Sequence, residues 1–286
     1  MQFRPSELIL NSRGAVFHLD LMPDEIADHV ILVGDPGRVK QVAAQLNDIE
    51  FERANREFVT TTGLFGDKRV TVVSTGIGTD NIDIVVNELD FLANIDLETR
   101  TENEEKRKLR LVRLGTCGIL QENIPPGAFI RSRYSIGFDA LMHFYKNQEG
   151  YDIYQLKDQL KTYLGTNGVE LPFYVAEPQG EFALEVPERH VGITATLPGF
   201  YGPQGRDIRV HVKYTEFLNL LNKFEAEDLK VVNFEMESSG LFGLATALGH
   251  DSCCICLGLA NRITSEVLKN PAERMEKLIL EVLEAV

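Results

Sequence analysis

Short apolar runs alternate with amphipathic segments along most of this chain. Several of the runs are continuous and rich in β-branched residues, which is typical of strands covered on both faces of a sheet. The pattern predicts strands over Val30–Val33, Val70–Thr75, Leu111–Leu114, Ala128–Arg131, Val191–Thr196, Val231–Phe234 and Cys253–Leu259.

Segments of helical periodicity lie between these runs. They predict helices over Gly37–Leu46, Asn81–Asn94, Tyr154–Leu164, Thr215–Lys223, Glu237–Leu248 and Pro271–Glu284. Pro36 and Pro271 stand where a first helical position is expected, and proline suits that position because no backbone donor is needed there. Strands that alternate with helices indicate an α/β fold. No segment has the composition of a linker, so residues 1–286 are expected to form one domain.

Two segments interrupt this alternation. Asp96–Arg110 is dense in charge and is expected to be a solvated helix or loop. Its opposite charges four positions apart, as on a helix surface, are Glu102 with Lys106 and Glu104 with Lys108. Tyr134–Glu188 has mixed polarity and several turn signals, and could form part of a lid or a subunit contact.

The composition excludes several classes of protein. Of 286 residues, 44% are hydrophobic and 25% are charged, and the net charge of −14 would repel a nucleic-acid backbone. No run approaches the ~18 apolar residues of a membrane span, and the first residues show no secretory signal. The neighbouring cysteines of Cys253–Cys256 lie in an apolar run, which indicates a buried strand and a cytoplasmic location rather than a disulfide framework.

Two arginines accompany small residues near predicted strand ends. Gly34 follows a strand, and Arg38 lies in the first turn of the next helix, so backbone N–H groups and a guanidinium could hold an anion. Arg113 lies inside an apolar strand, where a charge must be paired. Gly115–Gly118 then follows as a small-residue turn that carries the hydroxyl of Thr116. A plain turn and an internal ion pair are the structural alternatives.

Two further segments follow apolar strands. Ser74–Gly78 could line the same pocket, but a tight turn explains it equally well, and the full dinucleotide fingerprint is absent because position 81 is asparagine. Glu235 and Glu237 flank Met236, a combination that suits sugar hydroxyls and the apolar face of a sugar. Acids that stabilise a helix N-terminus, or a pair of glycosidase carboxylates, are the alternatives.

A loop rich in glycine and proline carries Phe200, Gln204 and Arg206. The amide offers a donor and an acceptor and the guanidinium offers only donors, so together they fit a planar ring with a C=O, N–H, C=O edge, as in uracil. Phe200 could stack on such a ring or on a ribose. Asn261 and Arg262 follow the cysteine-rich strand at its carboxyl end, where α/β folds bind ligands.

In this order, the segments resemble the nucleoside phosphorylase family, from about Phe17 to the C-terminus. The motifs that carry the resemblance are Gly34-Asp35-Pro36-x-Arg38, Arg56-Glu57-Phe58, Ser74–Gly78, Arg113-x-Gly115-Thr116-x-Gly118 and Glu235–Ser238. The resemblance implies a central mixed, twisted β-sheet flanked by helices. The implied phosphate site consists of Gly34, Arg38, Arg56, Arg113 and Thr116. The implied base site consists of Phe200, Gln204, Arg206 and Arg262. The implied ribose site consists of His18, Glu235, Met236 and Glu237.

The same resemblance implies an oligomer. Arg56 and His18 would reach into the site of a neighbouring subunit, so a homodimer is the smallest expected active unit, and hexamers are possible. A potassium ion could lie at the dimer interface near Glu57, Ile77 and Asn81. Asn81 stands where the family has serine, Pro203 where it has glycine, and the insert Asp96–Arg110 could block hexamer contacts.

The expected activity is reversible phosphorolysis of uridine to uracil and ribose 1-phosphate, with inorganic phosphate as co-substrate and no cofactor. Asn261 favours the pyrimidine branch, because purine-specific members resemble one another in having aspartate there. The alternatives are a purine nucleoside phosphorylase or a nucleosidase of the same fold, and a non-catalytic nucleoside-binding protein. The expected partners are small molecules and copies of this chain, with neither nucleic acid nor a membrane.

Overall fold

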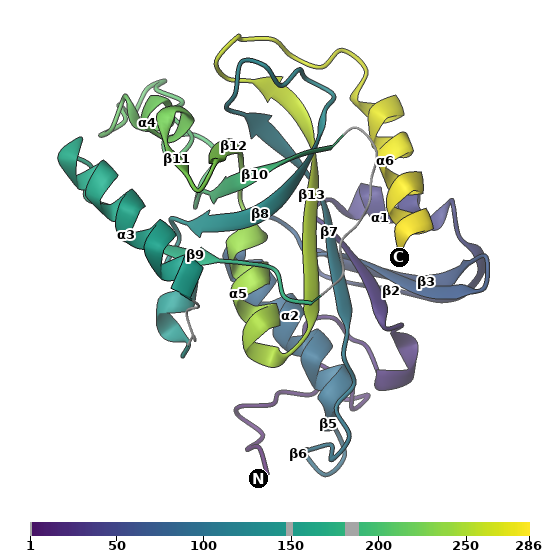
Figure 1. Cartoon of the computed structure of the whole chain (residues 1–286). Helices are drawn as coiled ribbons and strands as arrows, with labels where there is room; N and C mark the ends of the chain where they lie inside the picture. The colour runs from purple at the N-terminus through teal and green to yellow at the C-terminus, as the bar shows by residue number, and fades with distance from the viewer. Residues whose placement is uncertain (1, 147–150, 181–188) are drawn as a thin grey trace.

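The computed structural model describes residues 2–146, 151–180 and 189–286 (Figure 1). Each of the seven predicted strands is present and is longer than predicted, because backbone pairing continues past the apolar run, although Thr75 and Ala128 lie just outside their strands. Their bounds are β1 His29–Val33, β4 Lys68–Ser74, β7 Arg110–Ile119, β8 Phe129–Gly137, β10 Arg189–Thr196, β12 Leu229–Glu235 and β13 Asp251–Asn261.

The six predicted helices are also present. Their bounds are α1 Pro36–Ala43, α2 Thr79–Asn94, α3 Tyr151–Thr166, α4 Phe217–Lys223, α5 Ser238–Leu248 and α6 Pro271–Ala285. Pro36 and Pro271 are the first residues of their helices, as predicted. In the part of the chain that the structure describes, no helix combines the length and apolar character needed to cross a membrane.

The strands join in one mixed sheet, which has eleven strands within the described residues. Its order is β11 Glu225–Ala226, β12, β10, β8, β13, β7, β1, β4, β3 Phe58–Phe65 and β2 Asn47–Asn55, with β9 Tyr174–Ala176 paired to β8. β1 is parallel to β4 and β7, whereas β13 is parallel to β7 and antiparallel to β8. The predicted mixed α/β fold is therefore confirmed.

The sheet also closes on itself. β12 pairs with β10 and, in the antiparallel sense, with β7, so β7, β13, β8, β10 and β12 form a ring. Phe234 of β12 lies opposite Gly118 of β7, and a Cβ on Gly118 would lie 2.3 Å from the Phe234 ring. Only glycine permits this approach. Gly115–Gly118 lies within β7, so the predicted small-residue turn is wrong.

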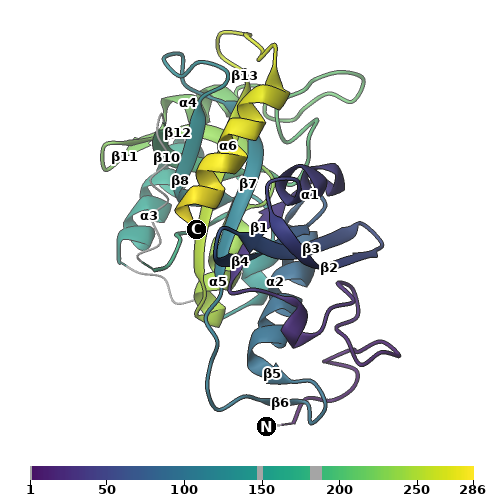
Figure 2. The ribbon, with the colours of Figure 1, turned by 90° about the vertical axis from the view of Figure 1, so that its right-hand side faces the viewer.

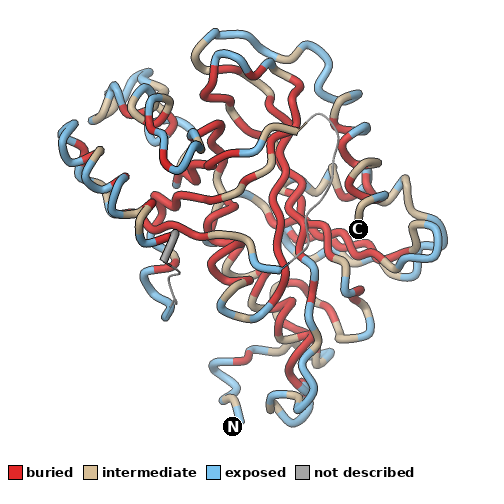
Figure 3. Tube along the Cα trace, viewed as in Figure 1, coloured by how far each residue is buried: buried red, intermediate tan, exposed pale blue. Residues whose placement is uncertain are grey.

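Helices cover both faces of the sheet. Alternate residues of β1 divide between them: Val30 and Leu32 face the core under α2 and α5, while Ile31 and Val33 face the core under α1 and α6. Figure 2 shows α6 and α1 on the side turned toward the viewer, with α2 behind the sheet. α3 and α4 cover a third core beside β8 and β10. Buried residues concentrate along the central strands in Figure 3.

Asp96–Arg110 is mainly a solvated loop, one of its two predicted forms, and most of its charged residues are exposed. Asp96–Arg110 contains the short antiparallel pair β5 Ile95–Asp96 and β6 Thr101–Glu102 in place of a helix. The predicted Lys106–Glu102 pair exists at 2.7 Å without a helix, whereas Lys108 pairs with Asp251 at 2.6 Å instead of Glu104.

The described part of Tyr134–Glu188 supplies the end of β8, α3 and β9. Buried residues such as Leu160 and Val175 place it in the core, so this part is no separate lid. Whether it makes a subunit contact stays a prediction. Residues 147–150 and 181–188 of this segment lie outside the described residues.

Candidate active site

A cleft of about 710 Å³ opens at the carboxyl ends of the central strands. It is lined by every residue predicted to bind phosphate, base or ribose except Arg56 and His18. The predicted residues that line it are Gly34, Arg38, Arg113, Thr116, Phe200, Gln204, Arg206, Glu235, Met236, Glu237 and Arg262. Strands and loops far apart in the sequence thus contribute to one site, as the parallel arrangement requires.

Two arginines form a cationic wall of the cleft. Arg38 comes from the first turn of α1, and Arg113 comes from the middle of β7. The Nη2 atom of Arg113 lies 3.7 Å from the position of a Cβ on Gly34, so the loop after β1 approaches this guanidinium closely. Burial and the charge of Arg113 lower the pKa of Arg38. The positive charges of Arg38 and Arg113 repel each other, and a bound anion would relieve this repulsion.

Arg113 is buried, with 4% of its surface exposed, and only part of its guanidinium is paired. Nη2 donates to Glu237 Oε2 at 2.5 Å, and Nε lies 3.7 Å from Glu235 Oε2. Burial alone would lower the pKa of Arg113, but Glu237 and Glu235 raise it above the usual arginine range. Within the described residues, Nε and Nη1 have no hydrogen-bond partner. Buried donors of this kind are costly, so they indicate a ligand with acceptor oxygens.

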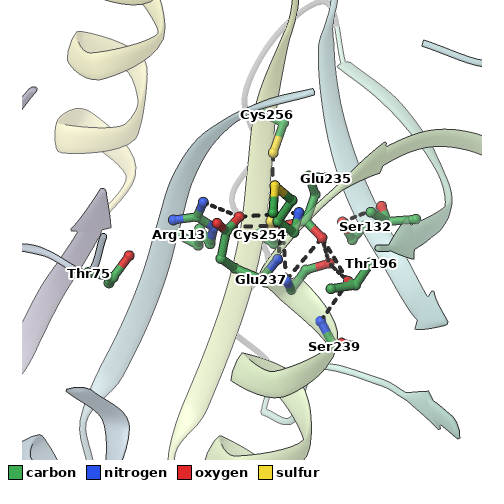
Figure 4. Close-up of polar contacts among 12 residues, drawn as sticks. Thr75, Arg113, Ser132, Thr196, Glu235, Glu237, Ser239, Cys254 and Cys256 are labelled. Carbon is green, nitrogen blue, oxygen red and sulfur yellow. Dashed lines mark hydrogen bonds and ion pairs between the residues drawn. The ribbon is translucent and has the colours of Figure 1, made fainter. Parts of the chain in front are cut away.

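The two neighbouring acids have different roles. Glu235 accepts hydrogen bonds from the hydroxyls of Thr196 and Ser238, both at 2.7 Å, and from the backbone N–H groups of Glu237 and Ser238 (Figure 4). Burial, followed by the charge of Glu237, raises the pKa of Glu235. Glu235 therefore acts as an acid that stabilises the N-terminus of α5, the structural alternative from the sequence analysis, and its carboxylate accepts hydrogen bonds from within the protein. The predicted ribose contact would have to displace one of these donors.

Glu237 instead connects three segments of the cleft. Its Oε1 accepts the backbone N–H of Gly78 at 2.9 Å, and its Oε2 accepts from Arg113. Gly78 belongs to the turn after β4, so the predicted contribution of Ser74–Gly78 to this pocket is present. Glu237 and Met236 both line the cleft, where a carboxylate edge and an apolar side chain suit a sugar.

The opposite wall consists of the loop after β10. Gln204 is 3% exposed, and its Oε1 accepts a hydrogen bond from Arg206 at 2.6 Å. The Arg206 guanidinium lies 3.7 Å from the centre of the Phe200 ring. Arg262 donates to the Gln204 carbonyl at 3.1 Å. Burial and the charge of Arg262 lower the pKa of Arg206. The four predicted base-site residues therefore form one connected group.

Pro203 fits this loop without loss of a bond. The N–H groups that close the turn belong to Gln204 and Arg206, which both donate to the Tyr201 carbonyl. Pro203 itself packs against Gly199, where a Cβ would lie 3.0 Å from the proline ring. The proline therefore stiffens the loop that presents the amide and the guanidinium.

Asn261 has a structural role. Its Nδ2 donates to the carbonyls of Gln121 and Ile124, both at 2.9 Å, and its Oδ1 accepts from the N–H groups of Ile263 and Thr264. The side chain is 1% exposed and does not line the cleft, whereas the next residue does. Asn261 therefore fixes the loop that presents Arg262 and has no group left for a base.

His18 and Arg56 lie outside the cleft of their own chain. His18 Nδ1 lies 2.7 Å from Glu88 Oε1, and the exposed Arg56 lies 5.6 Å from the centre of the Phe17 ring. Phe17 and His18 are in edge contact at 5.1 Å. This surface cluster is compatible with the predicted contribution to another subunit, which stays a prediction.

The residues predicted to lie near a cation gather around Gly76. Asn81 Nδ2 lies 2.3 Å, and Glu57 Cγ 3.6 Å, from the position of a Cβ on Gly76. Ile77 is 70% exposed and also lines the cleft. A carboxylate and an amide oxygen are donor types that fit an alkali cation.

The sequence analysis did not identify the hydroxyls behind Glu235. Thr196 and Ser238 bond directly to its carboxylate, and Ser135 approaches Ser238. The available signal was a hydroxyl at every second position within apolar strands, as at Thr194 and Thr196. The side chains of Thr194 and Thr196 are both fully buried, so each needs a partner.

Comparison with known proteins identifies the family. Residues 28–285 match the model of the phosphorylase superfamily, and the chain belongs to that family. It is 27% identical to a uridine phosphorylase from Thermococcus kodakarensis, over 93% of this chain and 84% of that protein. It is 28% identical to a DeoD-type purine nucleoside phosphorylase from Alkaliphilus metalliredigens, over 93% of this chain and 99% of that protein.

A solved structure shows the same fold. The Trypanosoma brucei nucleoside phosphorylase, described as showing uridine phosphorylase activity, superposes with a TM-score of 0.85 at 26% identity. The match covers 97% of this chain and 98% of the other. The predicted nucleoside phosphorylase fold is therefore confirmed.

Proposed function

We propose that this protein catalyses the reversible phosphorolysis of uridine to uracil and ribose 1-phosphate. The observation that carries the proposal is the pairing of two groups in one cleft. The unpartnered donors of Arg113 beside Arg38 suit phosphate, and the Gln204–Arg206 pair suits a uracil edge. The uridine phosphorylases among its relatives support the same substrate.

Phosphate is the nucleophile in this reaction. Arg38, Arg113 and Thr116 hold it below the ribose, while Met236 and Glu237 face the sugar. The bond from C1′ to the base lengthens toward an oxocarbenium-like state, which the phosphate dianion stabilises. A phosphate oxygen then bonds to C1′ as the electron pair of the broken bond leaves with uracil.

The leaving base takes up negative charge, and the loop after β10 is placed to stabilise it. Arg206 and Gln204 act where that charge develops, which is the effective place for electrostatic catalysis. A ring-nitrogen acid is not required for uracil, because the charge spreads over its oxygens and nitrogens. The Asn261 amide makes its hydrogen bonds within the protein and offers no acid to a ring nitrogen, which agrees with a reaction that needs none.

The alternatives meet specific obstacles. A purine phosphorylase needs a group for N7, and Asn261 has none free. A nucleosidase uses water and has no need of two arginines on one wall. A non-catalytic nucleoside-binding protein has no need of the buried, partly unpaired guanidinium of Arg113.

We also propose the assembly that the family resemblance implies. Arg56 and His18 lie together outside their own cleft, which supports a homodimer in which Arg56 of the partner subunit contacts phosphate and His18 of the partner subunit contacts the ribose. Glu57, Ile77 and Asn81 are proposed to lie near a potassium ion at that interface. The four cysteines are free and buried, which supports a reducing, cytoplasmic location. A role in pyrimidine salvage follows from the proposed reaction with uridine.

The variant Arg206→Ala tests the base assignment. Loss of one donor to developing charge typically costs ~10²–10³ in rate, so turnover of uridine should fall by that factor while phosphate affinity is unchanged. Arg209→Ala is the matched control, because Arg209 is an exposed arginine of the same loop that does not line the cleft. Equal turnover by the two variants would disprove the uracil assignment.

A further inference from the structure

A buried polar chain leads from the cleft into the core behind it. Glu235 accepts a hydrogen bond from the Thr196 hydroxyl, and Thr196 Oγ1 accepts the backbone N–H of Ser239 at 3.0 Å (Figure 4). The Ser239 hydroxyl donates to Asp139 Oδ2 at 3.0 Å. The Tyr174 hydroxyl donates to Asp139 at 2.9 Å and lies 2.9 Å from Ser239 Oγ.

The donor and the acceptor are defined at each hydrogen bond between Glu235, Thr196 and Ser239. A hydroxyl has one proton to donate. Because a carboxylate only accepts, the Thr196 proton points to Glu235 Oε1 at 2.7 Å, and the Thr196 oxygen accepts the backbone N–H of Ser239. Ser239 therefore helps to hold the hydroxyl that bonds to the carboxylate.

The inner end of the chain is rigid. Asp139 and Tyr174 are both buried, and Asp139 also accepts the backbone N–H of Leu141 at 2.9 Å. A buried carboxylate loses much free energy when it loses such donors, so this end resists movement. Burial raises the pKa of Tyr174, and the charge of Asp139 adds to the effect, so the phenol keeps the proton that it donates.

Packing and strand register keep the chain in line. Gly137 of β8 lies beside Thr196 of β10, which lies beside Glu235 of β12. A Cβ on Gly137 would lie 2.4 Å from the Tyr174 ring and 2.8 Å from Ser239 Oγ. Glycine at this position lets the tyrosine and the serine meet.

We propose that Asp139 and Tyr174 are positioning residues of the active site. Asp139 and Tyr174 hold Glu235 through Ser239 and Thr196. Glu235 in turn accepts the backbone N–H groups of Glu237 and Ser238 at the start of α5, and these bonds hold Glu237 in the orientation that faces the sugar. Neither Asp139 nor Tyr174 lines the cleft, so they act without touching a substrate. The part of this inference that concerns the sugar rests on the proposed function.

Kinetics of Tyr174→Phe and Asp139→Asn test the inference. Both should lower kcat/KM for uridine by about tenfold, the scale of one hydrogen bond to a charged group. The loss should be smaller for 2′-deoxyuridine, which lacks a hydroxyl that Glu237 faces. Tyr163→Phe is the matched control: it removes a hydroxyl that donates to the Leu220 carbonyl at 3.1 Å, outside this chain of contacts.

A second measurement does not depend on activity. The amides of Glu237 and Ser238 donate to Glu235, so their hydrogen–deuterium exchange should accelerate in Tyr174→Phe and stay unchanged in Tyr163→Phe. Equal losses for both nucleosides, or unchanged exchange at these two amides, would overturn the inference. A wild-type protein without uridine turnover would refute the proposed function instead, and the exchange rates alone would then decide whether the chain of contacts is coupled.

Discussion

Replacement of Arg113 by methionine should damage stability and phosphate binding together. The side chain is 4% exposed and neutralises two carboxylates, at 2.5 Å for Glu237 and 3.7 Å for Glu235. Methionine fills much of the space but leaves these acids buried without a cation. Breaking a buried pair in this way costs about 3–5 kcal/mol, which corresponds to a fall in Tm of roughly 5–8 °C for a chain of this size.

Thermal unfolding with and without phosphate separates the two effects. A ligand at about 100 times its Kd stabilises a protein by about 2.7 kcal/mol, so wild type should show a clear rise in Tm on addition of phosphate. Arg113→Met should show little or none, because the donors of the guanidinium are gone. The double variant Arg113→Met/Glu237→Leu should recover part of the lost stability, since one uncompensated charge is removed with its partner.

Two outcomes would refute this reasoning. An Arg113→Met protein as stable as wild type would show that the two carboxylates do not depend on the guanidinium. Undiminished protection of that variant by phosphate would show that the anion binds elsewhere.

Three other substitutions have definite expected results. Gly118→Ala should lower Tm and the yield of folded protein, because the added methyl would overlap the Phe234 ring where the sheet closes. Asn261→Asp should cost more than about 1–3 kcal/mol in unfolding free energy, since an acceptor would face two carbonyls, and assays with inosine should show no gain of turnover. Burial raises the pKa of Tyr174, so the protein should lose folding stability as pH rises above about 10 and the phenol ionises. Urea titrations should show a smaller alkaline loss of stability for Tyr174→Phe than for wild type. The same titrations should show no such change for Tyr154→Phe, because Tyr154 is exposed.

The regular elements could be predicted because buried strands and helices leave strong patterns. The apolar run of β13, for example, is buried on both faces and has no other plausible form. The β2–β3 hairpin was missed because β2 is an edge strand whose residues are mostly exposed, so its sequence is polar. The closure of the sheet was missed because it depends on contact between Gly118 and Phe234, which no local pattern indicates.

The site was predictable where one residue type carried the signal. An arginine inside an apolar strand needs a partner, and Arg113 indeed pairs with two carboxylates and lines the cleft. The separate roles of Glu235 and Glu237 could not be predicted. They follow from contacts with Thr196 and Gly78, which are distant in the sequence. For the same reason, the structural role of Asn261 could not be predicted, because its amide bonds to Gln121 and Ile124 join segments that are distant in the sequence.

The release of uracil from uridine by the purified protein, with and without added phosphate and with inosine in parallel, tests the proposed reaction most directly. Phosphate-dependent release from uridine, with ribose 1-phosphate as the second product, is the predicted result. Phosphorolysis of inosine instead would contradict the assignment of the Gln204–Arg206 loop, and release without phosphate would contradict the role of Arg38 and Arg113.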